Sequence, residues 1–332
     1  MDETSHISPL RRWLESILVW YILFMIVYLF ARFILQTEWR FIALVNNAVP
    51  YLFFPVIVGL AIAALLKSRR LTGLYFLVAL IGALWIIPPL IPAQFNASET
   101  DSGIDIITFN LYPYNEEFDA VTDWILAHSP DILALQELPA DQSLVADIEA
   151  SYEYGISQAY ETGHAFYSNY PIVESGDIQV NETIMQRVVV DIEGTQVVFY
   201  NVHLFMPFND READWLVLRY DESRRNAQIE VLLELIQAET LPVIVTGDFN
   251  MTEWSPMYHQ IASVLDDAYR QTSWGIGATW PAGESEDTSD GYPRLLRLDY
   301  VWYSEPIEAN YAIVGSAPGS DHFPLRVELN IP

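Results

Sequence analysis

The sequence contains no cysteine, and residues 99–332 contain no lysine. Without cysteine the chain has no disulfide framework, no zinc–cysteine site and no thiol nucleophile. The lysine-free part holds nine arginines against forty acidic residues, which gives it a net charge of −31. It therefore lacks the basic surface with which proteins grip nucleic acid.

The charge is distributed unevenly along a chain that is 52% apolar. Residues 1–98 carry seven basic and four acidic residues, a net of +3, which brings the whole-chain charge to −28. Apolar and acidic residues thus occupy different segments. We predict a membrane domain over residues 1–98 and a folded domain over residues 99–332, where abundant Val, Ile, Leu, Tyr and Trp argue against disorder.

Three long apolar runs follow one another in the first part, at about residues 14–35, 41–66 and 71–91. Each reaches the ~20 residues that cross a hydrocarbon core ~30 Å thick. A buried core does not tolerate three such runs in series, and a cleaved signal peptide is a single short run. We therefore expect three transmembrane helices and a multi-pass protein of the cell membrane.

The basic residues beside these runs predict the orientation. Arg11 and Arg12 precede the first run, and Lys67, Arg69 and Arg70 lie between the second and third. Loops rich in Lys and Arg tend to stay in the cytoplasm. Three crossings then place the second domain outside the cytoplasm.

Residues 99–332 alternate between short β-rich runs and amphipathic segments. Helices are expected at residues 118–127 and 224–238, and strands at 104–110, 132–136, 188–192, 197–202, 243–246, 299–303, 312–314 and 325–329. The runs at residues 188–192 and 197–202 are separated by a turn with Gly194, which predicts a hairpin. Many short strands and few helices indicate two packed sheets with helices outside.

Polar residues recur at the ends of the predicted strands, where a sheet fold can bring them into one cleft. They are Asn110 in ITFN, Gln136 and Glu137 in LALQEL, Asn201 and His203 in FYNVHL, Asp248 and Asn250 in VTGDFN, Asp299 in LRLDYVW, and Asp321 and His322 in GSDHFPL. Each motif alone is weak, because a lone Asp-His pair is usually a surface coincidence. Their joint occurrence in this order is specific.

The ordered motifs resemble those of the endonuclease/exonuclease/phosphatase superfamily, the group related to DNase I, Mg-dependent sphingomyelinases and inositol polyphosphate 5-phosphatases. The resemblance covers roughly Gly103 to Asn330 and includes a turn at residues 168–172 and the stretch at residues 251–256. It implies an α+β catalytic domain, a four-layer α/β/β/α sandwich, preceded here by three transmembrane helices. It also implies a phosphoric ester hydrolase that depends on Mg²⁺ or Mn²⁺.

The resemblance also implies a role for each matching residue. Glu137 would be the main metal ligand, helped by Asn110 and Asp321, because oxygen ligands suit these hard cations. Asp299 would contact and orient His322, which could then accept a proton from water. Asp248 and Asn250 would position the attacking water, and His203 would contact the phosphate or protonate the leaving oxygen. Whether His322 or Asp248 is the general base stays open.

Four functions are compatible with these motifs: an enzyme on membrane phosphoesters, of phospholipase C or sphingomyelinase type; an extracytoplasmic nuclease; an anchored hydrolase of small phosphoesters; and a silent binding module. The complete motif set argues against the last. The scarcity of basic residues argues against a nucleic-acid partner, although Arg219, Arg224 and Arg225, or Arg294 and Arg297, could form local basic patches. A tether from Pro92 to Gly103, at most ~40 Å long, would keep the catalytic domain near the lipid bilayer.

Overall fold

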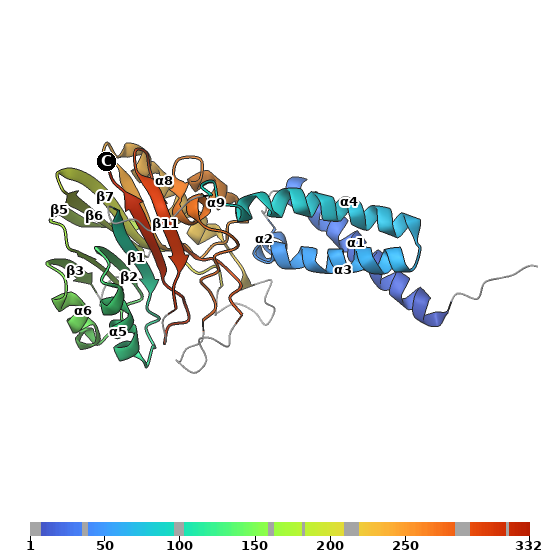
Figure 1. The fold of residues 1–332 in the computed structure, drawn as a ribbon, viewed down its shortest axis with the longest axis horizontal. Helices are drawn as coiled ribbons and strands as arrows, with labels where there is room; N and C mark the ends of the chain where they lie inside the picture. Colours follow the sequence, from blue (N-terminus) through green and yellow to red (C-terminus); the bar gives the residue numbers. More distant parts are fainter. Residues whose placement is uncertain are drawn as a thin grey trace, which may run out of the picture. The chain divides into compact units, whose positions relative to one another are not determined.

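The computed structural model describes residues 8–34, 39–95, 103–158, 163–180, 183–208, 219–282, 293–316 and 319–332. The chain divides into two compact units. One, the helical unit, holds the residues up to Pro89 together with residues 219–220, and the other, the body, holds the remaining described residues from Leu90 onward (Figure 1).

Within the described residues, the helical unit contains four helices, α1 (Pro9–Ile34), α2 (Arg40–Asn46), α3 (Val49–Leu65) and α4 (Arg69–Ile86). Two of them, α1 and α4, are long and apolar enough to cross a membrane, and a third span exists if α2 and α3 count as one. α2 and α3 meet at a bend of 77°.

This bend falls inside the run over residues 41–66, which the sequence predicts as one helix. The prediction of one continuous helix is wrong, because Pro50 lies in the first turn of α3. Proline has no backbone N–H and disfavours a helical residue before it, so a new helix begins there. The expected span at residues 71–91 likewise ends early, at Ile86, before a short 3₁₀ turn at Pro88–Leu90.

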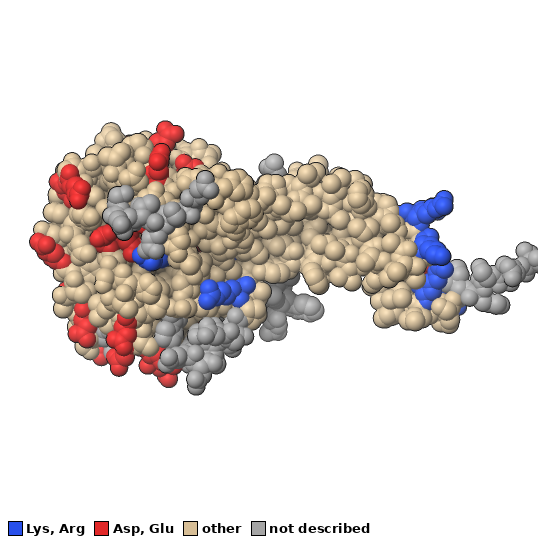
Figure 2. All heavy atoms as spheres, viewed as in Figure 1, with Lys and Arg blue, Asp and Glu red and all other residues tan. Residues whose placement is uncertain are grey.

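Small residues let α3 and α4 approach closely. A Cβ atom at Gly59 would lie 2.1 Å from the Tyr75 ring, and one at Gly82 would lie 2.1 Å from the Phe53 ring. The Arg11 guanidinium donates to the Leu66 carbonyl at 3.1 Å, which places the start of α1 beside the α3–α4 turn. The two basic loops that we predict to be cytoplasmic therefore lie at the same end of this unit, where Figure 2 shows a group of basic side chains.

The body contains two six-stranded sheets. The first has the strand order β11-β12-β1-β2-β4-β3, and the second has the order β5-β6-β7-β8-β10-β9. The strands of the first sheet are β1 (Ile104–Asn110), β2 (Ile132–Gln136), β3 (Tyr154–Gln158), β4 (His164–Ser168), β11 (Glu308–Val314) and β12 (Leu325–Asn330). Those of the second are β5 (Ile172–Val180), β6 (Thr183–Ile192), β7 (Thr195–His203), β8 (Val243–Asp248), β9 (Asp266–Asp267) and β10 (Asp299–Tyr303).

The two sheets face each other across one apolar core, in which the Phe166 and Phe199 rings lie 5.2 Å apart. A second core joins the outer face of the first sheet to α5 (Phe118–His128) and α6 (Ala146–Ala150). A third joins the outer face of the second sheet to α8 (Ser223–Ala238) and α9 (Pro256–Ile261). Helix, sheet, sheet and helix thus form the four layers that the sequence predicts.

The topology brings strand ends from both sheets together, along one edge that runs across the strands. β1 and β2 are parallel and joined by α5, while β7 and β8 are parallel and joined by α8. The carboxyl ends of each pair therefore lie at one edge of their sheet. β10 runs antiparallel to β8, so its first residue, Asp299, lies opposite Asp248, the last residue of β8.

The predicted hairpin is confirmed as β6 and β7, with Gly194 at a φ of 98° in the turn. Both predicted helices of the body are present as α5 and α8. The sequence did not predict β3, β4 and β5. β4 is five buried residues without alternation, and β5 is a largely exposed edge strand, so neither carries the period-2 pattern that marks a strand.

A buried polar bridge joins the two sheets beneath this edge. Asn201 of β7 donates to the carbonyls of Leu135 and Ala165 in the first sheet, at 3.1 and 3.0 Å. Its own side-chain oxygen accepts from Gln136 Nε2 at 2.7 Å. Asn201 and Gln136 are both fully buried. Water cannot reach their polar groups, and the bridge supplies hydrogen-bond partners in its place.

We predict that Asn201→Ala destabilises the body by about 3 kcal/mol, because each buried partner left unsatisfied costs ~1–3 kcal/mol. For a domain of this size the midpoint of thermal unfolding should fall by roughly 6–12 °C. Gln196→Ala, an exposed position on the same strand, is the control and should leave the midpoint nearly unchanged. Equal midpoints for the two variants would contradict a structural role for the bridge.

Candidate functional site

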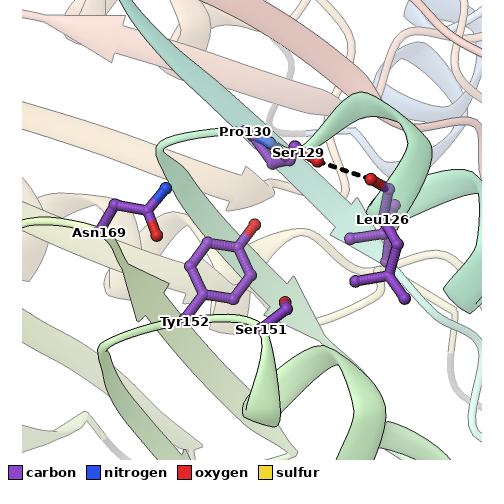
Figure 3. Close-up of a pocket in the computed structure, with 7 residues that line it drawn as sticks. Leu126, Ser129, Pro130, Ser151, Tyr152 and Asn169 are labelled. Carbon is purple, nitrogen blue, oxygen red and sulfur yellow. Dashed lines mark hydrogen bonds between the residues drawn. The ribbon is translucent and has the colours of Figure 1, made fainter.

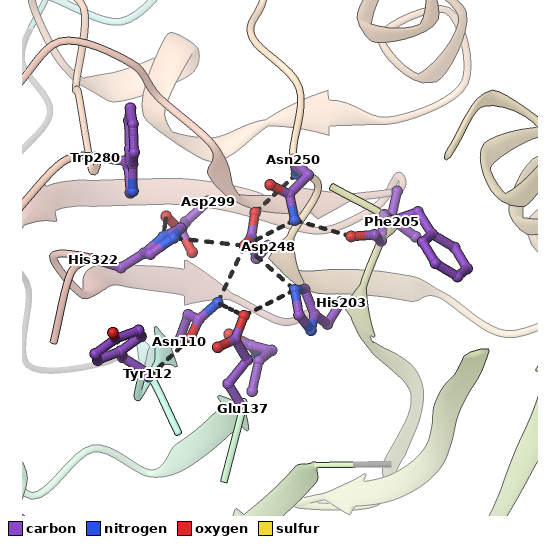
Figure 4. A network of polar contacts seen from close by, with 12 residues as sticks. Asn110, Tyr112, Glu137, His203, Phe205, Asp248, Asn250, Trp280, Asp299 and His322 are labelled. Carbon is purple, nitrogen blue, oxygen red and sulfur yellow. Dashed lines mark hydrogen bonds and ion pairs between the residues drawn. The ribbon is translucent and has the colours of Figure 1, made fainter. Parts of the chain in front are cut away.

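The shared edge of the two sheets carries a cluster of polar side chains (Figure 4). It gathers residues from β1, β7, β8 and β10 and from the loops that follow β2 and β8 and precede β12. Members that the sequence predicts are Asn110, Glu137, His203, Asp248, Asn250, Asp299 and His322. We call this group the polar cluster.

Asp248 lies at the centre of the polar cluster, and its residue is 1% exposed. Its Oδ1 accepts from the Asn250 backbone at 2.8 Å, and its Oδ2 accepts from Asn110 Nδ2 at 3.2 Å. The Nε2 atoms of His203 and His322 lie 3.8 and 3.7 Å from the same Oδ2. Burial raises the pKa of the Asp248 carboxyl to about 6, although the two imidazoles oppose the rise.

His322 and Asp299 form a buried pair. His322 Nδ1 lies 2.8 Å from Asp299 Oδ2, and the residues are 5% and 0% exposed. Burial alone would lower the pKa of His322, but the carboxylates of Asp299 and Asp248 raise it to about 10. The contact fixes the ring so that Nε2, its other nitrogen, faces Asp248.

Glu137 and His203 close the other side of the polar cluster. His203 Nε2 lies 3.2 Å from Glu137 Oε1, which also accepts from Asn110 Nδ2 at 3.1 Å. The Asn110 oxygen accepts from the Tyr112 backbone at 3.0 Å. In this geometry Asn110 positions the carboxylates of Glu137 and Asp248, while its predicted role as a metal ligand stays a prediction.

The backbone around the polar cluster is strained at several points. Glu137, Asn250 and Tyr112 have φ values of 52°, 48° and 57°, in the left-handed region that side chains other than glycine rarely occupy. Such residues persist where the surrounding structure determines them, and they concentrate at functional sites. Gly247 has a φ of 133°, and a Cβ there would lie 1.9 Å from the Val202 carbonyl oxygen. Only glycine fits this step before Asp248.

Two buried hydroxyl residues that the sequence did not single out hold the loops in place. Ser320 Oγ donates to the Asn110 carbonyl at 2.6 Å and accepts from the His322 backbone at 3.0 Å. Thr279 Oγ1 accepts from the Asp299 backbone at 3.3 Å. Ser320 stands in the SDH motif, but Thr279 stands in none that we identified, so its role emerges only from the fold.

Asp321, the remaining predicted site residue, precedes His322 in the same loop. Its Oδ2 accepts a long hydrogen bond from Trp280 Nε1, at 3.4 Å. Burial raises the pKa of the Asp321 carboxyl, and the negative charge of Glu137 adds to the rise while His322 opposes it. Glu137 and Asp321 are therefore close enough to repel each other.

The residues present fit a hard divalent cation. Glu137, His203 and Asp248 offer atoms that all lie within 4.8 Å of one another, as do Asp248, Asp299 and His322. Most of these donors are carboxylate oxygens, which Mg²⁺ and Mn²⁺ prefer. Burial raises the pKa of both Asp248 and Asp321, and neighbouring carboxylates add to the rise, so a cation bound there would favour the ionised forms of these groups.

The pockets found elsewhere in the body lack such a set of groups. One, of about 60 Å³, lies between α5 and the Tyr152 loop and is lined by Ser129, Ser151 and Asn169 among others (Figure 3). Another, of about 490 Å³, lies between the end of α8 and the turn at Pro306. Neither is lined by a histidine, and of the two acids that line the second, Glu239 and Glu305, Glu239 is already ion-paired with Arg187 at 2.7 Å. The polar cluster is therefore the stronger candidate for a functional site.

A family model described as the endonuclease/exonuclease/phosphatase family matches residues 94–322. No curated protein matches the sequence. Among solved structures, a mannosyl-6-phosphatase of Bacteroides thetaiotaomicron VPI-5482 superposes with a TM-score of 0.56 at 19% identity, over 69% of this chain and 100% of that one.

Two further structures are similar to the chain. A family protein of Bacteroides vulgatus gives a TM-score of 0.55 at 19% identity, over 70% of this chain and 100% of its own. A humanized D. rerio TDP2 carrying 14 mutations gives 0.55 at 16% identity, over 70% and 100% of the two chains. At these identities the similarity shows the fold.

We predict that His322 and Asp299 act as one unit. His322→Ala should lower kcat by at least the ~10²–10⁴-fold typical of lost acid–base catalysis. Asp299→Asn should cost less, and the double variant should resemble His322→Ala, because groups that act together lose most of their effect with the first removal.

Asp177→Asn, an exposed acid of β5, is the control for a loss of negative charge, and thermal unfolding should verify that each variant is folded. Losses that multiply in folded variants would show that His322 and Asp299 work independently.

Proposed function

Because the chain belongs to the endonuclease/exonuclease/phosphatase family, whose members hydrolyse phosphoesters, we propose that it is a membrane-anchored, metal-dependent phosphoester hydrolase. The observation that supports this most directly is the geometry around Asp248. There a buried His322–Asp299 pair and the Glu137–His203 pair face the same carboxylate. A binding module would have no need to bury this many titratable groups together.

A divalent cation held by Glu137, with Asp321 and Asp248 nearby, would polarise a phosphoryl oxygen and so make the phosphorus more electrophilic. The protein's own residues supply the proton chemistry. Asp248 and His322 share one small region, with His322 Nε2 3.7 Å from Asp248 Oδ2. A water bound to both groups would be oriented by them and would lose its proton to Asp248, or to His322 when that imidazole is neutral.

Asn250 and His203 complete the arrangement from the side of β7 and β8. The Asn250 side chain donates to the Leu204 carbonyl at 2.9 Å, so its position is fixed relative to His203. His203 is partly exposed and can reach a substrate, where it would contact the phosphate or donate a proton to the leaving oxygen. Asp299 keeps the His322 ring oriented through the reaction.

The substrate that we favour is a phosphodiester or phosphomonoester at a membrane surface. Nucleic acid is disfavoured by the charge of the body and by the burial of two arginines that could have formed basic patches. Arg225 is ion-paired with Glu222, and Arg297 is ion-paired with Asp267 and Glu253. Both side chains are at most 1% exposed, so neither can meet a polyanion.

The experiment that tests the proposed function is an activity panel with the full chain in lipid vesicles and Mg²⁺ or Mn²⁺. The panel contains a zwitterionic phospholipid, an oligonucleotide and a small phosphomonoester, the last suggested by the mannosyl-6-phosphatase neighbour. We expect phosphoester hydrolysis that requires the cation, with the oligonucleotide the poorest substrate. No hydrolysis of any ester by a folded chain would contradict the proposal.

We predict that Glu137→Gln weakens the dependence on the cation. The substitution keeps the shape of the side chain and removes the negative charge that balances the metal. Activity should fall by about 10²-fold or more at limiting Mg²⁺ and recover in part at high Mg²⁺. Glu116→Gln is the matched control, because Glu116 is an exposed acid in the loop that follows β1. A wild-type rate and Mg²⁺ dependence in Glu137→Gln would show that the ligand assignment is wrong.

We also predict that the body lies outside the cytoplasm, on the basis of the basic loops at Arg11, Arg12, Lys67, Arg69 and Arg70. A reporter enzyme that works only outside the cytoplasm should be active when fused after Pro332 and inactive when fused after Arg70. Activity in the reverse pattern would overturn this orientation.

A further inference from the structure

The segment that follows α4 is bonded to the body by its backbone. The Leu90 carbonyl accepts from the Gly275 N–H at 2.9 Å, and the Gln94 N–H donates to the Gln271 carbonyl at 2.8 Å. The sequence predicts a tether that begins at Pro92, but the structure makes this part of the body. Between the end of α4 at Ile86 and Leu90 the chain can therefore span at most ~14 Å.

Large apolar side chains are exposed where this segment meets the body. Phe95 is 70% exposed, and Trp274 is 60% exposed. Their rings meet edge to face with centroids 5.8 Å apart. Ile91 is 39% exposed in the same segment. We call Ile91, Phe95 and Trp274 the aromatic patch.

The two stretches of chain that carry the aromatic patch hold no charged residue. Residues 88–98 and 271–282 contain neither acids nor bases, although the acidic part of the chain has a net charge of −31. One exposed acid contacts them, because Asp266 accepts a hydrogen bond from the Gln271 side chain at 2.8 Å. Moving uncharged stretches with exposed aromatic rings into a lipid interface costs little desolvation and buries apolar area. Tryptophan in particular favours the membrane–water interface.

Hydrogen bonds join the Trp274 side of the aromatic patch to the rest of the body. Arg270 of α10 (Ala268–Thr272) donates to the carbonyls of Gly275 and Ile276, the two residues that follow Trp274. Arg270 Nε also donates to the buried carboxylate of Glu253 at 2.6 Å, and that carboxylate accepts from Arg297 Nη2 at 3.1 Å. Arg297 precedes Asp299 by two residues, so ion pairs connect the patch to the strand that carries the His322 partner.

We propose that the aromatic patch inserts into the interfacial layer of the lipid bilayer that α4 crosses, so that the body is docked on the membrane. The inference rests on the proposed membrane anchorage and goes beyond it. Anchorage alone needs only the helices, whereas docking fixes which face of the body meets the lipid. The occupant is the bilayer because Ile91, the first residue of the patch, follows the end of an apolar helix at Ile86 by only five residues.

The absence of cysteine permits a direct test with single-cysteine variants of the full chain in phosphatidylcholine vesicles. Gln94→Cys places a bimane label beside Phe95. Ser175→Cys, at an exposed position of β5, is the matched control, because β5 and β9 form opposite edges of the second sheet and α10 directly follows β9. Docking would hold the first label within ~10 Å of the headgroup–acyl boundary.

Lipids with a nitroxide near the headgroup should therefore quench the label at Cys-substituted position 94 several-fold more than the one at position 175. Adding Phe95→Ser and Trp274→Ser should reduce this quenching to the control level while thermal unfolding shows a folded body. Weak quenching at position 94, or quenching that persists in the Phe95→Ser/Trp274→Ser variant, would overturn the proposal.

An alkaline wash of the vesicles separates this result from a failure of anchorage. If the protein stays with the vesicles but position 94 is not quenched, docking is wrong and anchorage stands. If the wash releases the protein, the proposed anchorage itself is wrong, and the docking inference is overturned with it.

Discussion

The structure of the body depends on holding several carboxylates together at the ends of neighbouring strands. Glu137, Asp248 and Asp299 come from three different segments, and two of them are almost fully buried. Such groups lose hydration on burial and repel one another. Both effects raise the pKa of the Asp248 carboxyl. The imidazole of His322 and the N–H groups of Asn110 and Asn250 offset part of this cost. A bound cation would offset more of this cost. The arrangement is unfavourable without a cation, and it suits the metal-dependent phosphoester hydrolysis that we propose.

The rest of the fold can be understood as the support for this arrangement. Two parallel strand pairs, each with its own crossover helix, bring polar residues to one edge, and Asn201 and Gln136 tie the two edges together from below. Residues in the left-handed region turn the chain sharply after β2 and β8, so that Glu137 and Asn250 face the polar cluster and not the core. Behind the site, the buried ion pairs of Arg297 and Arg270 extend this support toward the surface that we propose to meet the membrane.

Much of the fold and of the site could be predicted from the sequence, because most of the site motifs stand at the end of a strand with strong apolar character. The motifs around Asn110, His203 and Asp248 therefore indicated both the strands and the polar edge. The edge strands escaped prediction, since an exposed strand such as β5 has no hydrophobic alternation. Thr279 escaped for a different reason. Its effect depends on the Asp299 backbone that the fold places beside it, and no local pattern records that. The bend before α3 does have a local signal, Pro50, which the long apolar run around it outweighed.

We expect the polar cluster to bind a divalent cation that compensates its negative charge. The most direct measurement is thermal unfolding of the chain after removal of metal with a chelator, followed by titration with Mg²⁺ or Mn²⁺. A cation that binds only the folded state stabilises it by ~2.7 kcal/mol at one hundred times its Kd, so the unfolding midpoint should rise with cation concentration. The rise should be lost when Glu137 is neutralised. A midpoint that does not respond to either cation, or that rises equally without the Glu137 charge, would contradict the claim.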